Sequence, residues 1–198
     1  MRSRILPKEY YLKDTLFLAR DLIGKYLVNT VDGEEIALRI LETEAYIGSI
    51  DKACHAYGGR RTQRTEVLYA EGGTAYIYLI YGMYYCMNIV TEEKDTACAV
   101  LIRGGEIVKG KEKASLLRYG KGLDALSKYQ LKNFSNGPGK VCKAMAIDKS
   151  LNYKKLYSDN LYVADKKEED PISDIKISKR INIDYAEEAK DFLWRFYV

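Results

Sequence analysis

The sequence has little of what membrane-spanning, secreted and metal-binding proteins need. Its 198 residues contain no uninterrupted apolar run of about 18 residues, the length that a membrane-spanning helix requires. The N-terminus lacks the apolar core of a signal peptide, so we expect a cytoplasmic protein with no membrane partner. One histidine, His55, and four cysteines without a CxxC pair provide no spacing typical of a metal site. In a reducing compartment these cysteines are expected to be free thiols.

What remains is the composition of an ordinary globular chain, with 47% hydrophobic and 30% charged residues. The sequence contains no internal repeat and no linker-like segment, so one domain is expected over residues 1–198. Hairpin and helix patterns alternate without regular βαβ units. This predicts an α+β fold with a curved, mostly antiparallel β-sheet and surrounding helices.

Cap and turn signals divide the chain into short elements. Asp14 can cap a helix that ends at Gly24, and Asp32-Gly33 can form the tight turn of a hairpin. The other elements expected are strands over 25–31, 34–46, 97–103 and 194–198, helices over 110–132 and 140–146, and an acidic surface loop over 166–170.

Positive charge is concentrated in one part of the chain. Residues 103–143 contain ten Lys or Arg against three acids, a net charge of +7 in a chain whose total is +4. A second group, Arg60, Arg61 and Arg64, lies in a loop that glycines open. Clustered positive charge predicts a face that binds a polyanion, although lysines on solvated helix faces give the same pattern.

Five tyrosines lie between Tyr76 and Asn88. A strand favours aromatic residues, but it does not need this many phenols, because each buried hydroxyl requires a hydrogen-bond partner. Tyr76 and Tyr78 share one face at strand period two. Gly82 then predicts a bend or bulge that turns the flanking rings outward. Flat rings beside a bend suit stacking on a flat ligand, for which a nucleobase is the leading candidate.

Residues upstream of the tyrosines could carry chemistry. Glu42, Glu44 and Tyr46 share one face of a predicted strand, and His55 lies eleven residues beyond Glu44. Desolvation beside aromatic rings raises the pKa of a carboxylate, which suits a general base. Two glutamates on one strand face are also typical of a solvated surface, and a single histidine is often structural.

Together these motifs resemble those of the alkyladenine (3-methyladenine) DNA glycosylases of the bacterial type. The matching segments, in the family's order, are Glu42-Thr-Glu-Ala-Tyr-Ile-Gly48, Ala53-Cys-His55, Gly58-Gly-Arg60, Tyr78-Leu-Ile-Tyr-Gly-Met-Tyr-Tyr-Cys-Met-Asn88, Ala97-Cys-Ala-Val-Leu-Ile-Arg103, Asn136-Gly-Pro-Gly-Lys140 and Trp194-Arg-Phe-Tyr-Val198. Each segment alone is a weak signal, whereas the ordered set is specific.

The resemblance implies a DNA repair enzyme that flips an alkylated or deaminated purine out of the duplex and hydrolyses its N-glycosidic bond. By match, Glu44 is the general base that activates a water, and Arg103 and the carbonyl of Ile181 help to hold that water. No lysine matches a Schiff-base nucleophile. The resemblance therefore implies a monofunctional enzyme that leaves an abasic site and needs no cofactor and no metal.

The same match assigns the DNA-binding positions. They are Tyr46, His55, Tyr78 and Asn88 for the base pocket, Tyr81 and Met83 for insertion into the duplex, and Arg60, Arg61, Arg64 and Lys140 for phosphate contacts. Tyr81 is expected to fill the gap that the flipped nucleotide leaves, and Asn88 to obstruct the exocyclic amino group of guanine. The implied partner is double-stranded DNA with a damaged purine, bound by a monomer that associates with the nucleoid through its DNA.

The chain departs from the family pattern at two places. Residues 62–65 read Thr-Gln-Arg-Thr where the family usually has Thr-Pro-Arg-Asn, which affects the expected phosphate contacts rather than the chemistry. Asn182 replaces the usual glycine after Ile181. Because asparagine tolerates left-handed backbone, the turn is expected to survive.

Two other functions stay open from the residues themselves. A non-catalytic module could stack its tyrosines on single-stranded nucleic acid, but it would have no use for Glu44, which repels phosphate. A metal-dependent hydrolase could use Glu42, Glu44, Asp51, Cys54 and His55, but one histidine gives no ligand-spacing signature.

Overall fold

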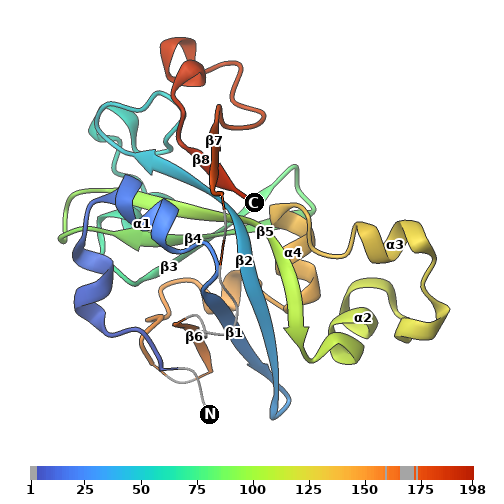
Figure 1. Ribbon diagram of the computed structural model, residues 1–198. Helices are drawn as coiled ribbons and strands as arrows, with labels where there is room; N and C mark the ends of the chain where they lie inside the picture. The colour runs from blue at the N-terminus through green and yellow to red at the C-terminus, as the bar shows by residue number, and fades with distance from the viewer. Residues whose placement is uncertain (1–3, 159, 166–171, 173) are drawn as a thin grey trace.

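The computed structural model describes residues 4–158, 160–165, 172 and 174–198. Its central sheet has the strand order β3-β4-β5-β2-β1-β6, and β8 pairs with both β2 and β7 (Figure 1). The strands are β1 (Tyr26–Val31), β2 (Glu34–Ile47), β3 (Ala75–Ile80), β4 (Tyr84–Thr91), β5 (Cys98–Lys109), β6 (Leu161–Ala164), β7 (Lys176–Ser178) and β8 (Arg195–Tyr197). All of these pairs are antiparallel, which confirms the predicted α+β fold.

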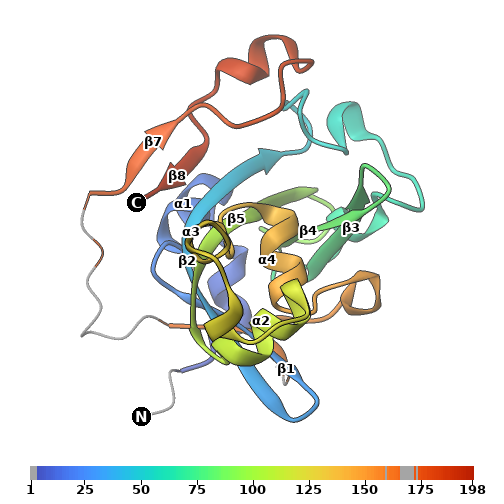
Figure 2. The ribbon, with the colours of Figure 1, turned by 90° about the vertical axis from the view of Figure 1, so that its right-hand side faces the viewer.

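Short helices surround the sheet, and the sheet curves around one of them, α4 (Figure 2). The α-helices are α1 (Thr15–Asp21), α2 (Lys111–Tyr119), α3 (Lys128–Lys132) and α4 (Pro138–Ala144). The 3₁₀ turns are η1 (Lys8–Leu12), η2 (Tyr57–Gly59), η3 (Glu66–Tyr69), η4 (Leu123–Ala125), η5 (Lys149–Leu151) and η6 (Glu187–Asp191). Among the described residues, no helix has the length and apolar character to cross a bilayer.

The predicted cap and turn form at the start of the chain. The Asp14 side chain accepts a hydrogen bond from the backbone N–H of Phe17 and starts α1, which buries Leu18 against the main core. Asp32 and Gly33 both have positive φ, as a two-residue type I′ turn between β1 and β2 requires.

Strand β2 connects most of the fold. One edge pairs along its length with β5, and the other edge pairs first with β1 and then with β8. The register with β5 shifts between Ile40 and Thr43, where the strand carries bulges. Beyond these bulges, Glu44 lies between Leu101 of β5 and Arg195 of β8, in the middle of the sheet. The chain's last strand therefore packs directly beside the proposed base.

The tyrosine run is a hairpin rather than one strand with a bend at Gly82. Strands β3 and β4 pair from Ala75 with Ile89 to Ile80 with Tyr84. At the tip, Tyr81 and Gly82 have φ of 53° and 71°, and the Met83 N–H donates to the Ile80 carbonyl at 3.2 Å. Left-handed backbone is unfavourable for a tyrosine, so the turn holds Tyr81 in a strained conformation.

Two further expectations are refined. The helical segment expected over 110–132 consists of α2, the turn η4 and α3, because Gly110 and Gly120 have positive φ at the two ends of α2. The strands β6 and β7 are not predicted, since four and three residues are too few to show a period. The acidic loop expected over 166–170 lies outside the described residues.

Candidate active site

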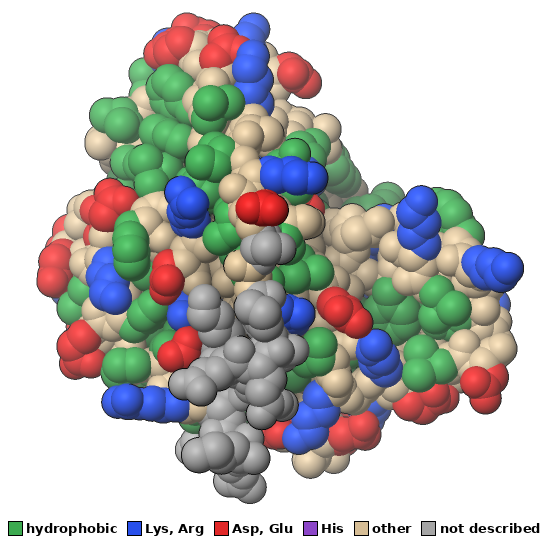
Figure 3. Space-filling model, viewed as in Figure 1, with side chains coloured by type: hydrophobic (Ala, Val, Ile, Leu, Met, Phe, Trp, Pro, Cys, Tyr) green, Lys and Arg blue, Asp and Glu red, His purple; other side chains and the backbone are tan. Residues whose placement is uncertain are grey.

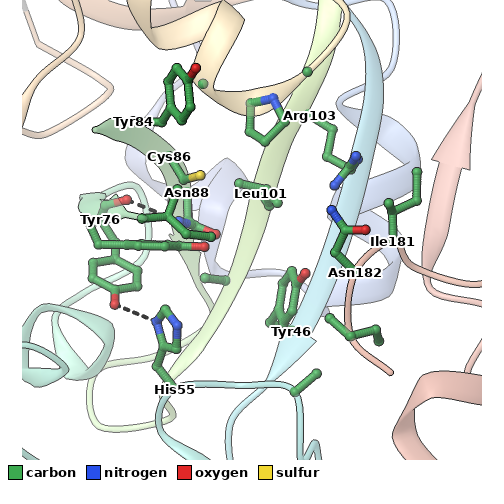
Figure 4. Close-up of a pocket in the computed structure, with 18 of the residues that line it drawn as sticks. Tyr46, His55, Tyr76, Tyr84, Cys86, Asn88, Leu101, Arg103, Ile181 and Asn182 are labelled. Carbon is green, nitrogen blue, oxygen red and sulfur yellow. Dashed lines mark hydrogen bonds between the residues drawn. The ribbon is translucent and has the colours of Figure 1, made fainter. Parts of the chain in front are cut away.

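A cavity of about 590 Å³ opens between the β3–β4 hairpin, β5, the start of α4 and the segment 181–185. This size is typical of a site for a small molecule or a single nucleotide. Figure 4 shows Tyr76, Cys86 and Asn88 on one side of the cavity, with Tyr46, Arg103 and Ile181 on the other. We call Glu44, Tyr46, Arg103 and Ile181 the carboxylate wall, and His55, Tyr76, Tyr78 and Asn88 the aromatic wall.

Glu44 is the fully buried member of the carboxylate wall, covered from the cavity by Tyr46, Arg103 and Ile181. Its Oε2 accepts a hydrogen bond from the Tyr46 hydroxyl at 2.8 Å, and its Oε1 accepts one from the Ile181 backbone N–H at 2.8 Å. Arg103 Nη1 lies 3.5 Å from the same Oε1. Desolvation raises the pKa of Glu44, while Arg103 and the two hydrogen bonds partly oppose that rise. The result is a fixed, desolvated carboxylate whose three partners line the cavity.

Arg103 is oriented by the second glutamate of the strand. Its Nε donates to Glu42 Oε1 at 3.0 Å, and Arg195 of β8 donates to the same oxygen at 2.6 Å. Glu42 and Glu44 thus face the same side of β2, as predicted, and share one arginine. Because that arginine is charged between two carboxylates, it reduces their mutual repulsion.

Histidine and tyrosine rings form the aromatic wall. The ring of His55 lies 4.7 Å from the ring of Tyr78 in an edge-to-face arrangement, and the Tyr76 ring lies 5.2 Å from that of Tyr78. The Tyr76 hydroxyl and His55 Nδ1 are hydrogen-bonded at 2.8 Å. Burial, with a smaller effect of Arg64, lowers the pKa of His55 to about 4. The imidazole is therefore neutral near pH 7.

Asn88 closes the inner end of the aromatic wall. The side chain is buried, and its Nδ2 donates to the Tyr76 carbonyl at 3.2 Å. This hydrogen bond holds the amide in place on β4, where Asn88 lines the cavity beside Leu101 of β5. A side chain held in this way can act as a rigid obstacle.

The hairpin tip is exposed. Tyr81 is 73% and Met83 66% exposed, although both are large and apolar. Tyr81 also lines the mouth of the cavity, together with Tyr185 from the C-terminal segment. Exposed apolar side chains beside a cavity are typical of a binding surface.

The sequence matches a family model, described as methylpurine-DNA glycosylase (MPG), over residues 9–198. The chain belongs to the methylpurine-DNA glycosylase family. Three bacterial relatives carry the name "Putative 3-methyladenine DNA glycosylase". Over 98% of this chain, identity is 54% with the protein of Clostridium perfringens (strain SM101), 52% with that of Clostridium novyi and 48% with that of Clostridioides difficile. The match covers 95%, 94% and 100% of those relatives, respectively.

The expected resemblance is thus confirmed, and the chain is a DNA glycosylase, an enzyme of DNA repair that acts on DNA. Tyr46, His55, Tyr78, Tyr81, Asn88, Arg103 and Ile181 all line one cavity, although the sequence separates them widely. Glu44 and the Ile181 N–H that it accepts from are 137 residues apart. Asn182 has φ of 60°, so the turn after Ile181 keeps the left-handed backbone that was expected there.

The basic residues of this glycosylase differ in how free they are. The Arg61 side chain donates to Glu66 and Asp95. Arg60 is exposed, and its backbone carbonyl accepts hydrogen bonds from the hydroxyls of Thr65 and Tyr69. The Arg64 guanidinium lies 5.2 Å from the centroid of the Tyr78 ring. Lys140 donates to the side chain of Asn136, and desolvation lowers its pKa. Arg61 therefore holds its loop together, whereas Lys140 lines the cavity and Arg64 lies beside a ring that lines it.

The net charge of residues 103–143 does not form one free positive face. Three of its lysines are paired with carboxylates: Lys109 with Glu35, Lys111 with Glu106, and Lys113 with Asp32. On the side seen in Figure 3, blue and red side chains lie interspersed. Exposed ion pairs are weak, so these lysines can still exchange partners when a polyanion approaches.

The residues of the alternative metal site do not converge. Asp51 pairs with Arg180, His55 with Tyr76, and Glu42 with two arginines. In the described part of the glycosylase, no three His, Cys, Asp or Glu side chains are arranged to hold a metal ion. All four cysteines are free and buried, and burial raises the pKa of Cys54 to about 12.

Several residues of the site were not predicted from the sequence. Tyr76 was not assigned to the base pocket, yet it lines the cavity and is hydrogen-bonded to His55. Arg118 and Tyr185 also line the cavity, and Arg180 lies behind it. Tyr76 could have been found, because it shares a strand face with Tyr78. The other three lie in segments whose positions only the tertiary fold determines.

Proposed function

We propose that this glycosylase flips an alkylated or deaminated purine out of duplex DNA and hydrolyses its N-glycosidic bond with Glu44 as the general base. The observation that carries the proposal is the buried Glu44 carboxylate, held by Tyr46, Arg103 and Ile181 at the wall of an aromatic cavity. A base inside a duplex cannot reach such a site without leaving the stack.

The aromatic wall suits an alkylated purine. N-alkylation of adenine at position 3, or of guanine at position 7, makes the base cationic, and electron-rich tyrosine faces attract cations by about 1–2 kcal/mol when both are desolvated. Tyr46 and Tyr78 would stack on the base from opposite walls. The names of the relatives make 3-methyladenine the first substrate to test, with neutral hypoxanthine as the deaminated alternative.

His55 and Asn88 would select among purines. In the tautomer where Tyr76 donates to Nδ1, the imidazole proton is on Nε2 and can be donated to the flipped nucleotide. Asn88, fixed by the Tyr76 carbonyl, would collide with the exocyclic amino group of a normal guanine. The neutral state of His55 supports this role, because an imidazolium would repel a cationic base.

The chemistry follows from the charge at the carboxylate wall. As the bond from C1′ to the purine nitrogen breaks, its electron pair leaves with the purine and the sugar becomes oxocarbenium-like. Glu44 stabilises this cation and takes a proton from the water that attacks C1′, which produces an abasic site. Arg103 and the Ile181 carbonyl would hold that water. The nucleophile in this scheme is water and not a lysine, so the proposed enzyme is monofunctional.

Tyr81 and Met83 would enter the duplex beside the extruded nucleotide. Their exposure at the tip of a strained turn supports this, because inserted side chains replace the lost stacking of a few kcal/mol. Arg60, Arg61, Arg64 and Lys140 would contact phosphates, with Arg61 first exchanging its carboxylate partners. Every one of these residues belongs to a single chain, so we propose that the enzyme acts as a monomer.

The test is an excision assay on duplexes that carry one 7-methylguanine, hypoxanthine or ethenoadenine, and on methylated duplex DNA for 3-methyladenine. After incubation with EDTA, alkali should cleave the strand at the lesion, whereas without alkali the strand should stay intact. Tight binding without any released base would contradict the proposal and favour the single-strand stacking module. Strand cleavage without alkali would show that the enzyme is not monofunctional.

A further inference from the structure

Behind the carboxylate wall lies an ion pair with no exposed atoms in either side chain. Arg180 and Asp51 form a two-pronged pair, in which Arg180 Nη2 donates to Asp51 Oδ1 at 2.8 Å and Nη1 donates to Oδ2. Asp51 also accepts the backbone N–H of Ala53 at 2.9 Å, which fixes the turn that follows β2. Neither residue lines the cavity.

Arg180 connects the segments that carry the carboxylate wall. Its guanidinium lies 4.7 Å from the centroid of the Tyr46 ring and 5.1 Å from that of Trp194, so it is stacked against both rings. It also donates to the carbonyls of Ala45 at 2.9 Å and Ala189 at 3.0 Å. The next residue in the chain, Ile181, supplies the N–H that holds Glu44.

We infer that Arg180 and Asp51 are positioning residues for Glu44, acting through the Tyr46 ring on one oxygen and the Ile181 backbone on the other. This inference rests on the proposed role of Glu44 as the base. The guanidinium donates to the carbonyl of Ala45, which lies between Glu44 and Tyr46, and it contacts the Tyr46 ring. Arg180 is also the residue directly before Ile181 in the chain. Both hydrogen bonds to the Glu44 carboxylate therefore begin at groups that Arg180 fixes.

Stability alone is a poor explanation for this pair. Apolar residues of similar volume in place of a buried ion pair are often as stable or more stable, because two charges need not be desolvated. What an apolar pair cannot do is donate hydrogen bonds to two carbonyls and place a cation over two rings at once. The pair is thus suited to fixing geometry, whatever it contributes to the free energy of unfolding.

The same reasoning allows a test in a protein that still folds. The double variant Arg180→Met with Asp51→Leu fills the space with apolar side chains, and Arg180→Lys keeps the charge but loses the planar fork. Leu38→Ala, in the core part of β2, is the control, because it lowers stability without touching the site. Thermal melts establish the temperature at which all four proteins are folded.

The readouts are the single-turnover excision rate as a function of pH and the dissociation constant for a duplex with an abasic-site analogue. Four groups from three elements face Glu44: Glu42 and Tyr46 from β2, Arg103 from β5 and the Ile181 N–H from the C-terminal segment. In the double variant, loss of the two hydrogen bonds should raise the pKa of Glu44 further. The acid limb of the rate profile should then move to higher pH by about one unit.

The maximal rate of the double variant should fall about 10- to 100-fold, because the base is no longer held in place, while affinity for the abasic duplex changes by less than about threefold. The maximal rate of Arg180→Lys should fall between those of the double variant and the wild type. Leu38→Ala should keep the wild-type rate and the wild-type position of the acid limb. An unshifted limb and a wild-type rate in the folded double variant would overturn the inference. If Glu44→Gln is itself active at the wild-type rate, the proposed function fails instead, so the two failures are distinguishable.

Discussion

The two walls of the cavity are assembled in different ways. The aromatic wall comes from neighbouring strands, since Tyr76, Tyr78 and Asn88 lie on one hairpin and only His55 is added from a loop. Its contacts are ring edges and ring faces, the hydrogen bond between Tyr76 and His55, and the hydrogen bond from the Asn88 amide. The carboxylate wall instead joins β2, β5 and the C-terminal segment, and its contacts are charged or charge-assisted.

Under the proposed function, this difference separates recognition from chemistry. Stacking tolerates small shifts, because rings attract a flat ligand over a range of offsets. A general base does not tolerate such shifts, because the position of the proton that it removes is fixed by the bound substrate. The wall that needs accuracy is the one held by a buried arginine and by hydrogen bonds to both carboxylate oxygens. Changes to the carboxylate wall should therefore affect the rate, and changes to the hairpin should affect binding.

The largest effect is expected for Glu44→Gln, which removes the charge but keeps the shape of the carboxylate wall. The single-turnover excision rate should fall about 1,000-fold, within the range for loss of a general base, while the dissociation constant for damaged duplex stays near that of the wild type. Glu106→Gln on the exposed end of β5 is the matched control and should keep the wild-type rate. A Glu44→Gln protein that is as active as the control would mean that another group activates the water.

The hairpin tip should give the next largest effect. Tyr81→Ser removes the ring that would fill the gap in the duplex, so affinity for damaged duplex should fall about 10- to 100-fold, with a smaller change in excision from single strands. Tyr129→Ser on α3 is the control, because Tyr129 is 75% exposed and Tyr81 is 73% exposed. Equal losses on duplex and single strand would argue against insertion at Tyr81.

The pH dependence should distinguish the two walls directly. In the proposed mechanism Glu44 must be ionised to act, and burial raises its pKa, so the rate should increase with pH through a value above the usual carboxylate range. His55 has a pKa of about 4 and stays neutral from pH 5 to 8. His55→Gln should therefore lower the rate by a few-fold without moving the acid limb. A shift of that limb in His55→Gln would assign it to the imidazole.

The smallest effect on the excision rate is expected for Asn88→Ala, which should change selectivity instead. Removal of the amide enlarges the inner end of the cavity, so release of normal guanine relative to 7-methylguanine should rise by up to about tenfold. Asn152→Ala is the control, because Asn152 accepts the backbone N–H of Ile77 on the same hairpin without lining the cavity. The ratio of released bases, measured by chromatography, should change only in the Asn88 variant.

Local signals in the sequence predicted the elements that local interactions form. The Asp14 cap, the Asp32-Gly33 turn and the long strand β2 lie where composition and period put them. The prediction that the tyrosine run forms a single strand with a bend at Gly82 was wrong, because the run forms the β3–β4 hairpin. Left-handed backbone at Tyr81 is unusual for a tyrosine, so residue preference alone does not reveal a tight turn at Tyr81-Gly82.

The candidate site was predicted from motif resemblance and from Glu44 and Tyr46 sharing a strand face. The sequence did not show that the Ile181 N–H donates to Glu44, or that Tyr76 holds His55. It also gave no indication of Arg180. An arginine in a polar C-terminal segment is typical of a surface, and only the tertiary fold buries it against two rings.

The contact between Ile181 and Glu44 also orders events during synthesis. The β3–β4 hairpin contains only contacts between nearby residues, whereas Glu44 obtains its amide partner only after the chain has been made as far as Ile181. Under the proposed function, the surface that binds damaged DNA could therefore form before the base is held in place. Activity would then report that the segment around Ile181 has joined the fold.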